Sequence, residues 1–421
     1  MEKPILVIGA GTFGLSTALE LSRSGYRNIT CFDKYPVPSP IAAGNDSNKI
    51  INYGGIYNPS ETQPPSKQIK VDAFKLWASD PVYKPHYHPV GFIYAGCSYD
   101  VISPRISPGA EYLESTEKIK RYLPVLTGPL TNWQGVKLND MDGWLHARNA
   151  LISAFEECQK LGVKFKFGTE GEITSLLQQD GRVEGVVSKS GKTYLGDTII
   201  LCAGPNVVSL FDFESQLQAK GFTLAHIKVT TEEAKKFKGL PVIMNAERGF
   251  FFEPDENDEL KICNEFPGYI NLNSEGESIP LFVNAIPTES ADAIREFLRE
   301  TMPEFSERPF VKTRTCWCTD SPDRQLILSH HPDFGNLILA SGDSGLSFML
   351  MPAIGKYVTN LVKGEPGIKE WKWRPETSLN RDDKQNRHGG DGVVKDLKDI
   401  KQWVSIENSL PHAIDFANAK M

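Results

Sequence analysis

The feature that most constrains the fold of this chain is a glycine pattern near its start. Gly9, Gly11 and Gly14 follow an uninterrupted apolar run at residues 5–8, and apolar residues at helical spacing continue over 15–24. An uninterrupted apolar run predicts a strand that is buried on both faces, as in a parallel sheet. In such a strand–loop–helix unit the first glycine permits a tight turn, the second lets the backbone approach a pyrophosphate, and the third permits close helix–strand packing.

An acidic residue completes this pattern. Residues 28–32 predict a second strand, and Asp33 ends it, 19 positions after Gly14. A carboxylate at this place accepts a hydrogen bond from a ribose hydroxyl. The unit therefore predicts a dinucleotide site rather than a purely structural turn, although this motif alone does not distinguish FAD from NAD.

Two later strand ends favour FAD. Residues 198–201 and 337–340 are apolar runs like the first one, and small residues follow both of them, at 203–204 and 341–345. The second group precedes a helical pattern at 352–362, and a helix N-terminus favours an anion. Three strand ends that carry glycine suit a long dinucleotide lying across the edge of a sheet.

The predicted parallel strands are far apart in the sequence, and antiparallel patterns lie between them. Residues 249–263 predict a hairpin and residues 171–195 a small meander. We therefore expect an α/β + α+β fold, in which a Rossmann-like FAD-binding domain of the glutathione-reductase type is interleaved with an antiparallel-sheet substrate domain. The expected FAD-binding domain comprises residues 1–60, 143–215 and 320–375, the substrate domain 61–142 and 216–319, and a surface-wrapping tail 376–421. Helices are expected over 67–79, 142–161, 288–301 and 352–362.

The composition argues against several other classes of protein. The 421 residues carry 46 Lys and Arg against 53 Asp and Glu, a net charge of −7, which argues against nucleic acid as the main partner. No apolar run approaches the ~20 residues of a membrane span, and the first residues match neither a signal peptide nor a transit peptide. The seven cysteines form an odd, scattered set, which argues against a disulfide framework and for a reducing compartment.

Three further stretches resemble the fungal fructosyl amino acid oxidases (amadoriases) of the monomeric sarcosine oxidase superfamily, which are D-amino-acid-oxidase-like flavoproteins. The first stretch is residues 39–51. The second, within 224–268, contains Gly-Phe-Phe-Phe-Glu-Pro-Asp-Glu and Lys-Ile-Cys-Asn-Glu-Phe-Pro-Gly. The third, within 316–356, contains Cys-Trp-Cys-Thr-Asp and Gly-Asp-Ser-Gly. With the glycine loop, the resemblance covers residues 4–375.

This resemblance implies an FAD-dependent oxidase that acts on CH–NH groups with oxygen as the acceptor. The substrate would be a secondary amine in an N-substituted amino acid, whose C–N bond is oxidised to an imine that hydrolyses while O2 is reduced to hydrogen peroxide. A fructosyl amino acid is the first candidate substrate, and saccharopine, pipecolate and sarcosine are alternatives within the superfamily. A flavin-binding protein without turnover is the remote alternative.

The resemblance also implies that the FAD is covalently bound to Cys316. In the family the linkage uses the first cysteine of the Cys-Trp-Cys-Thr run, which begins at Cys316 here. On a strand, Cys316 and Cys318 point to the same face, so that the residues alone allow either to meet a ligand. Two buried core thiols are the competing interpretation. The family pattern assigns the linkage to Cys316 and leaves Cys318 with a structural role.

Charged residues form the second part of the implied site. Lys261 and Glu265 lie four positions apart, which places them on one face of a continuous strand, ~13 Å apart at about 3.3 Å per residue. From the residues alone they could equally be two charges on a solvated face. The resemblance implies that Lys261 activates dioxygen through its positive charge, with Lys49 as a second basic residue near the flavin ring. It implies that Glu265 binds the polar part or the amine of the substrate.

Arg374 is expected to bind the substrate carboxylate. It matches the position where amadoriases place an arginine for this purpose, and a planar guanidinium suits bidentate binding of a carboxylate. A surface arginine between tryptophans is the competing interpretation. Leu346 and Met349 depart from the family, which usually has histidine and lysine there, so that substrate specificity is left open while FAD binding is expected to survive through backbone amides.

The expected cofactor contacts come from loops at strand ends, and Ser344 is expected to contact the substrate as well. They are Gly9, Gly11, Thr12, Phe13, Gly14, Asp33, Lys34, Ser47, Asn48, Lys49, Ile173, Ala203, Gly204, Cys316, Asp343, Ser344, Gly345, Phe348 and Met349. No metal is expected, because the histidine pairs at 86–88 and 330–331 have no cysteine or acidic partner at ligand spacing.

The chain ends in Ala419, Lys420 and Met421, which resembles the C-terminal peroxisomal address. This predicts a peroxisomal import receptor as a partner and the peroxisome as the location, with the cytoplasm as the alternative. The other expected partners are the amine substrate and O2, without nucleic acid or membrane, and the chain is expected to be a monomer.

Overall fold

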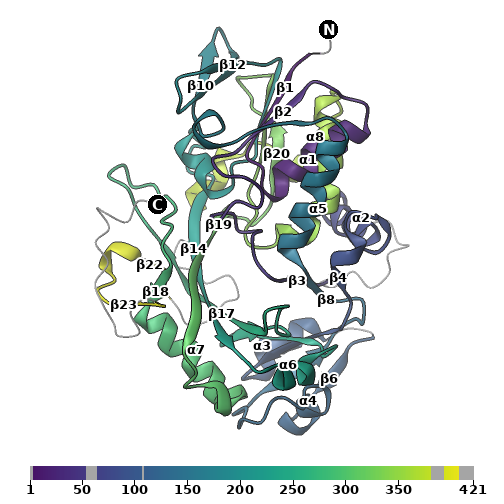
Figure 1. Ribbon diagram of the computed structural model, residues 1–421, viewed down its shortest axis with the longest axis vertical. Helices are drawn as coiled ribbons and strands as arrows, with labels where there is room; N and C mark the ends of the chain where they lie inside the picture. The colour runs from purple at the N-terminus through teal and green to yellow at the C-terminus, as the bar shows by residue number, and fades with distance from the viewer. Residues whose placement is uncertain (1–2, 54–63, 107–108, 381–392, 407–421) are drawn as a thin grey trace.

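The computed structural model describes residues 3–53, 64–106, 109–380 and 393–406 (Figure 1). Its upper half is built on a six-stranded sheet in the order β20–β21–β13–β1–β2–β9. Neighbouring strands are parallel except for the edge pair of β20 with β21. The prediction of a parallel sheet assembled from distant segments is therefore confirmed. The strands are β1 (Ile5–Ile8), β2 (Ile29–Phe32), β9 (Lys164–Lys166), β13 (Thr198–Leu201), β20 (Ile327–His330) and β21 (Leu337–Ser341).

Helices cover one face of this sheet, and a small meander covers the other. The helices are α1 (Thr12–Arg23), α2 (Pro65–Ser79), α5 (Ala147–Lys160) and α8 (Met351–Val362), which share one apolar core with the strands. The meander is the predicted one, with β10 (Ile173–Gln179), β11 (Arg182–Ser188) and β12 (Thr193–Leu195). It encloses a second core against the alternate side chains of β1 and β13.

The lower half is built on a second, nine-stranded sheet, in the order β19–β14–β17–β16–β15–β5–β7–β6 with β22 beside β17. Its pairs are antiparallel except β5 with β15 and β17 with β22. The predicted hairpin is present as the pair of β16 and β17. The strands are β5 (Phe92–Gly96), β6 (Glu111–Leu113), β7 (Gln134–Lys137), β14 (Gln218–Lys228), β15 (Val242–Asn245), β16 (Gly249–Phe251), β17 (Glu259–Ile270), β19 (Phe310–Asp320) and β22 (Lys395–Asp396).

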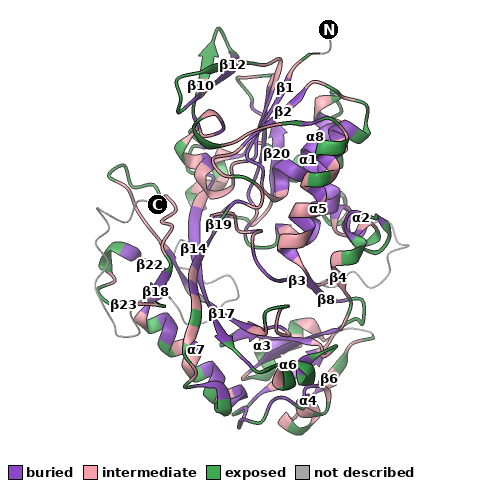
Figure 2. Cartoon of the chain, in the orientation of Figure 1, coloured by how far each residue is buried: buried purple, intermediate pink, exposed green. Residues whose placement is uncertain are grey.

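The two faces of the second sheet have different neighbours. Its outer face packs on helices, chiefly α7, through an apolar core (Figure 2). The helices of this half are α3 (Tyr99–Ile102), α4 (Thr116–Tyr122), α6 (Thr231–Phe237) and α7 (Thr288–Thr301). Its inner face carries aromatic side chains and Cys316 in a separate cluster. This inner face is the one that meets the loops of the first half.

Short strands connect and extend the two halves. β3 (Lys49–Ile51) and β4 (Tyr87–His88) pair with β8 (Gly143–Leu145). In the described part of the carboxyl-terminal segment, β22 adds to the second sheet and β23 (Trp403–Ser405) pairs with β18 (Ala285–Pro287). Among the described residues, no helix combines the length and the apolar character that crossing a bilayer requires.

Two expectations differ from the structure. The helix expected over 142–161 begins only at Ala147, because residues 143–145 pair with β3 and β4, and Trp144 stacks on His88 with ring centroids 3.8 Å apart. Helix α2 falls in the expected substrate domain, yet it packs into the core of the first half with Trp77 fully buried. Its most extensive contacts are with α8.

The close crossing of α1 and α8 predicts a steric test. A Cβ atom on Gly355 of α8 would lie 2.1 Å from the carbonyl oxygen of Ser16 in α1, whereas a Cβ atom on the exposed Gly335 would meet nothing within 4 Å. We expect Gly355→Ala to lower the free energy of unfolding by about 2 kcal/mol, although alanine favours a helix over glycine by about 1 kcal/mol. Chemical denaturation measures this, and Gly335→Ala is the matched control. Equal stability of the two variants would show that the helices can move apart freely.

Candidate functional site

A cavity of about 730 Å³ opens at the carboxyl ends of the central strands of the first sheet. Its walls come from the loops that follow four strands of this sheet. They are Gly9 and Gly11 after β1, Asp33 after β2, Ala203 and Gly204 after β13, and Asp343 and Gly345 after β21. Segments far apart in the sequence thus meet at one sheet edge. This edge is where doubly wound α/β sheets bind their ligands.

The three glycines of the first loop have different surroundings. Gly9 has φ +107°, and a Cβ atom there would lie 2.4 Å from the carbonyl oxygen of Cys202. A Cβ atom on Gly14 would lie 1.8 Å from the carbonyl oxygen of Gly9. The protein itself therefore requires these two glycines. A Cβ atom on Gly11 would meet no protein atom within 4 Å, and Gly11 lines the cavity, so its open side is available to a ligand.

Asp33 is held in place at the end of β2. Its Oδ2 accepts a hydrogen bond from the Ala10 amide at 2.9 Å, and its Oδ1 accepts one from the Tyr35 amide at 3.1 Å. Burial raises the pKa of Asp33, and these backbone hydrogen bonds oppose that rise. The carboxylate lines the cavity with remaining acceptor capacity, as a ribose hydroxyl requires.

The loop after β21 is tied to the end of β19. Asp343 accepts a hydrogen bond from the Thr319 amide through Oδ2 and another from the Gly345 amide through Oδ1, both at 2.8 Å. Ser344 lies in the left-handed region with φ +45°, and its Oγ accepts a hydrogen bond from the Ser321 amide at 3.3 Å. These hydrogen bonds fix the conformation of the loop and attach it to β19 of the second sheet.

A second cavity, of about 140 Å³, adjoins the first and lies on the inner face of the second sheet. The two cavities share Lys49, Cys318, Gly345 and Phe348 as wall residues. Most of its other walls are apolar, and both departures from the amadoriase pattern belong to them. These apolar walls include Ile50, Phe222, Leu224, Met244, Phe250, Phe252, Leu346 and Met349.

Two ammonium groups meet one carboxylate at the junction of the cavities. The Lys261 Nζ lies 2.6 Å and the Lys49 Nζ 2.9 Å from the Oδ2 of Asp46. Lys261 also donates to the carbonyl oxygen of Asn48 at 2.9 Å. Burial alone would raise the pKa of Asp46, but the positive charges of Lys261 and Lys49 hold it well below its usual value. Burial would likewise lower the pKa of Lys49, and the charge of Asp46 raises it above its usual value instead.

Sequence reasoning missed Asp46, although it lies inside a stretch that carried the family resemblance. The signal was available, because a lysine on a largely apolar strand must find a carboxylate if it is buried. Lys261 is such a lysine, since Ile262, Cys263 and three phenylalanines surround its position in the predicted hairpin.

The two cysteines of β19 face the second cavity together, as their spacing predicts. The Cys316 Sγ lies 3.9 Å from the Lys49 Nζ and belongs to the apolar cluster of the inner face. Cys318 lines both cavities. All seven cysteines of the chain are described, and all are free thiols.

The structure brings most of the other expected residues to these cavities. Thr12, Phe13, Lys34 and Ile173 line the first cavity, and Ser344 lines the second. Gly14 lies behind the loop, and Ser47 and Asn48 line neither cavity. Glu265 belongs to β17, but its side chain lies outside the described residues, and the pairing of β17 with β14 shifts register between Asn264 and Tyr269.

An unpaired polar atom in the wall of the first cavity fits a bound FAD. Ser39 Oγ is buried and has no hydrogen-bond partner among the described residues. Buried polar atoms in proteins nearly always have a partner. Together with the open side of Gly11 and the carboxylate of Asp33, this hydroxyl suits a large polar cofactor spanning the cavity.

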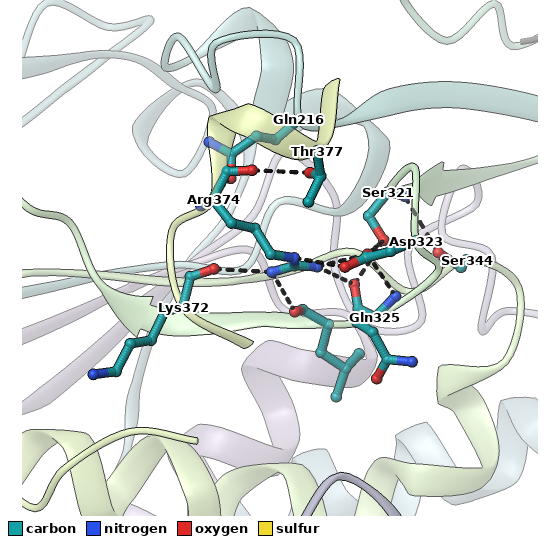
Figure 3. A network of polar contacts seen from close by, with 9 residues as sticks. Gln216, Ser321, Asp323, Gln325, Ser344, Lys372, Arg374 and Thr377 are labelled. Carbon is teal, nitrogen blue, oxygen red and sulfur yellow. Dashed lines mark hydrogen bonds and ion pairs between the residues drawn. The ribbon is translucent and has the colours of Figure 1, made fainter. Parts of the chain in front are cut away.

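Arg374 is placed differently from the expectation (Figure 3). Its Nε and one terminal nitrogen donate to the two carboxylate oxygens of Asp323, at 2.8 and 2.9 Å. The remaining guanidinium hydrogens go to the carbonyl oxygens of Gln325, Leu326 and Lys372. All five donors of the guanidinium are thus used, and Arg374 lines neither cavity.

The expectation that Arg374 binds a substrate carboxylate is therefore not supported, and the competing interpretation of a surface arginine is wrong as well, since the residue is 8% exposed. Its network instead leads through Asp323 and Ser321 to Ser344, as Figure 3 shows. Arg374 braces the loop beside the second cavity.

The histidines have other partners. His86 bonds to Ser153 at 2.8 Å, and His330 bonds to the carbonyl oxygen of Leu361 at 3.1 Å. Elsewhere, His226 pairs with Glu259 at 2.9 Å on the second sheet, and Asp255 lies close enough to form a three-residue group with metal-ligand chemistry.

Comparison with known proteins supports the resemblance. Residues 4–361 match the family model described as DAO: FAD dependent oxidoreductase. The chain is similar to the crystal structure of a fructosyl amine:oxygen oxidoreductase, amadoriase I, from Aspergillus fumigatus, with a TM-score of 0.91 and 38% identity over 97% of this chain and 98% of that one. It is 28% identical to an L-saccharopine oxidase of Schizosaccharomyces pombe over 89% of this chain and 94% of that protein. It is 30% identical to a human peroxisomal sarcosine oxidase over 85% of this chain and 91% of that protein.

The bracing role of Arg374 predicts a loss of stability without a loss of substrate binding. We expect Arg374→Lys to lower the free energy of unfolding at pH 7 by about 2 kcal/mol, because Asp323 loses a bidentate partner. The folded pKa of Asp323 lies below its usual value of 3.8, so the difference should be present above pH 4 and shrink as the pH falls. Denaturation at several pH values measures this. A large rise in KM for the amine with unchanged stability would restore the substrate role.

Proposed function

We propose, on the premise that this chain belongs to the DAO family of FAD dependent oxidoreductases, that it oxidises the C–N bond of a secondary amine in an N-substituted amino acid. The observation that carries the proposal is the junction of the two cavities. There the described residues place two ammonium groups and a thiol beside an apolar pocket that opens into the dinucleotide cavity.

When bound, FAD supplies two-electron chemistry, taking a hydride from the carbon next to the amine nitrogen and passing two electrons to dioxygen. The imine is then hydrolysed, so that one amine, one dioxygen and one water give a carbonyl compound, a smaller amine and hydrogen peroxide. Lys261 and Lys49 place positive charge where negative charge develops on dioxygen, without any reorganisation at the moment of reaction. The apolar walls of the second cavity exclude water from this step.

The residues divide between holding the cofactor and meeting the substrate. Cys316 would attach FAD covalently, and Gly11, Asp33 and the 343–345 loop would hold its phosphates and ribose. Ser344 and Met349 lie on the second cavity, where the substrate would approach. Glu265 remains a proposed contact for the amine or its polar substituent.

The substituent on nitrogen is the open part of the proposal. The similar amadoriase I favours a fructosyl amine, and the saccharopine and sarcosine oxidases favour the alternatives. Leu346 and Met349 give the second cavity two apolar walls in the loop where the amadoriase pattern has charged or polar ones. Pipecolate, saccharopine and sarcosine therefore stay beside fructosyl amino acids as candidates.

We also propose that the enzyme is a peroxisomal monomer. The C-terminal Ala419-Lys420-Met421, which lies outside the described residues, supports peroxisomal import, and the peroxisome is suited to an enzyme that releases hydrogen peroxide. The cytoplasm is the alternative location.

A panel of amines tests the reaction and ranks the substrates. Fructosyl amino acids, saccharopine, pipecolate and sarcosine are each mixed with the enzyme, first without oxygen to follow bleaching of the flavin and then with oxygen to measure peroxide release as kcat/KM. We expect at least one to bleach the flavin and to release peroxide. If none of them reduces the flavin, the chain is a flavin-binding protein without this turnover.

The covalent linkage has its own test in the two cysteines of β19. We expect the flavin of the wild-type protein to stay with the chain after acid precipitation, and Cys316→Ser to release it, because the thiol that forms the bond is gone. Cys318→Ser is the matched control and should retain the flavin. Release from Cys318→Ser alone would move the linkage to the second cysteine.

A further inference from the structure

We propose that Asp46 is a positioning residue, which fixes both ammonium groups at the junction of the cavities for the reaction with oxygen. This inference rests on the proposed oxidase function. One atom of the residue, Oδ2, accepts from both lysines, so a single carboxylate sets the places of Lys261 and Lys49 together.

Asp46 is itself held firmly. Its Oδ1 accepts a hydrogen bond from the Ser47 amide at 2.9 Å, and its carbonyl oxygen accepts one from the Arg148 amide at the start of α5, also at 2.9 Å. Arg314 braces the same loop by donating to the carbonyl oxygens of Asn45 at 2.8 Å and Ala42 at 2.7 Å. The carboxylate is therefore anchored to both halves of the molecule.

Lys261 and Asp46 are buried, so that the loss of either partner would leave the other charge without solvent to stabilise it. The side chains of Lys261 and Asp46 are 2% and 3% exposed, and that of Lys49 is 23% exposed. Without the carboxylate, Lys261 would keep the carbonyl oxygen of Asn48 and its place 5.1 Å from the centroid of the Phe252 ring, and Lys49 would keep its contact with the Cys316 sulfur. Two like charges that had both lain within 3 Å of one atom would then repel each other in a site of low dielectric constant.

A competing role for Asp46 is charge balance alone. The charged groups that face it are Lys49, Lys261, Arg314 and Lys312, so one anion offsets part of a positive cluster. If that were its only role, removing the negative charge would leave more positive charge near dioxygen and would speed its reduction. If Asp46 acts by position, removing it slows the same step, and the two roles thus predict opposite changes.

The experiment measures reoxidation of the flavin in the holoenzyme by stopped-flow absorbance. The flavin is reduced with dithionite rather than an amine, so that the result does not depend on the substrate, and is then mixed with oxygen, which takes two electrons and two protons to give hydrogen peroxide. We expect Asp46→Asn to slow reoxidation at least tenfold. Asp46→Glu, which keeps the charge but moves it by one methylene, should also slow it. Asp80→Asn, which removes a buried partner of Arg23 outside both cavities, is the matched control and should change it by less than about twofold.

A coupled variant shows whether Asp46 acts through the lysine. In a Lys261→Met background, Asp46→Asn should slow reoxidation by a smaller factor than it does in the wild-type protein, because only the ammonium group of Lys49 is left to position. Fully multiplicative effects, or faster reoxidation in Asp46→Asn, would overturn the proposal. If Asp46→Asn does not accumulate as holoenzyme, Asp46→Glu decides, with unchanged reoxidation counting against the proposal. If no amine reduces the flavin but these variants still slow reoxidation, the proposed substrate class is wrong and the proposed role of Asp46 is supported.

Discussion

The ion pair between Asp46 and Lys261 joins the two halves of the molecule. Asp46 lies in a loop that leads into β3, and Lys261 lies on β17 of the second sheet, so their 2.6 Å contact sets how the second sheet meets the dinucleotide cavity. Burying two charges costs free energy that a single pair barely recovers. Such a pair is therefore better understood as specifying one arrangement of the two halves, with Lys49 as a third member that extends the cluster toward Cys316.

Local patterns predicted the dinucleotide half well because each of its parts is enforced locally. Gly9 and Gly14 are required by backbone atoms that lie within 3 Å of any added Cβ, and Asp33 comes at a strand end that its own apolar run defines. The prediction that a helix begins at residue 142 is wrong because residues 143–145 form a strand instead. The partner strand β4 lies more than fifty residues earlier in the chain, where a local pattern does not reveal it.

The side-chain contacts that decide the site are long-range, and for that reason the sequence was a poorer guide to them. Arg374 satisfies four of its five donors with Asp323 and the carbonyl oxygens of Gln325 and Leu326, about fifty residues earlier, and its tryptophan neighbours do not indicate these partners. Asp46 was overlooked because its importance depends on a lysine 215 positions later. Motif position identified Cys316 and Lys261 as candidates, but only the fold shows that Lys49 lies beside the thiol.

The parallel sheet of the first half has a consequence for how the protein is made. β1 and β2 are synthesised before their outer neighbours β9 (Lys164–Lys166) and β13 (Thr198–Leu201), and β13 in turn pairs with β21 (Leu337–Ser341), much later in the chain. During synthesis the outer edge of β13 therefore remains without its partner strand while β14, β15, β16, β17 and β19 of the second sheet emerge, and contacts between such distant segments form slowly. The dinucleotide cavity, whose last wall is the loop after β21, cannot close before that segment is available. Cofactor loading thus becomes one of the last events of folding.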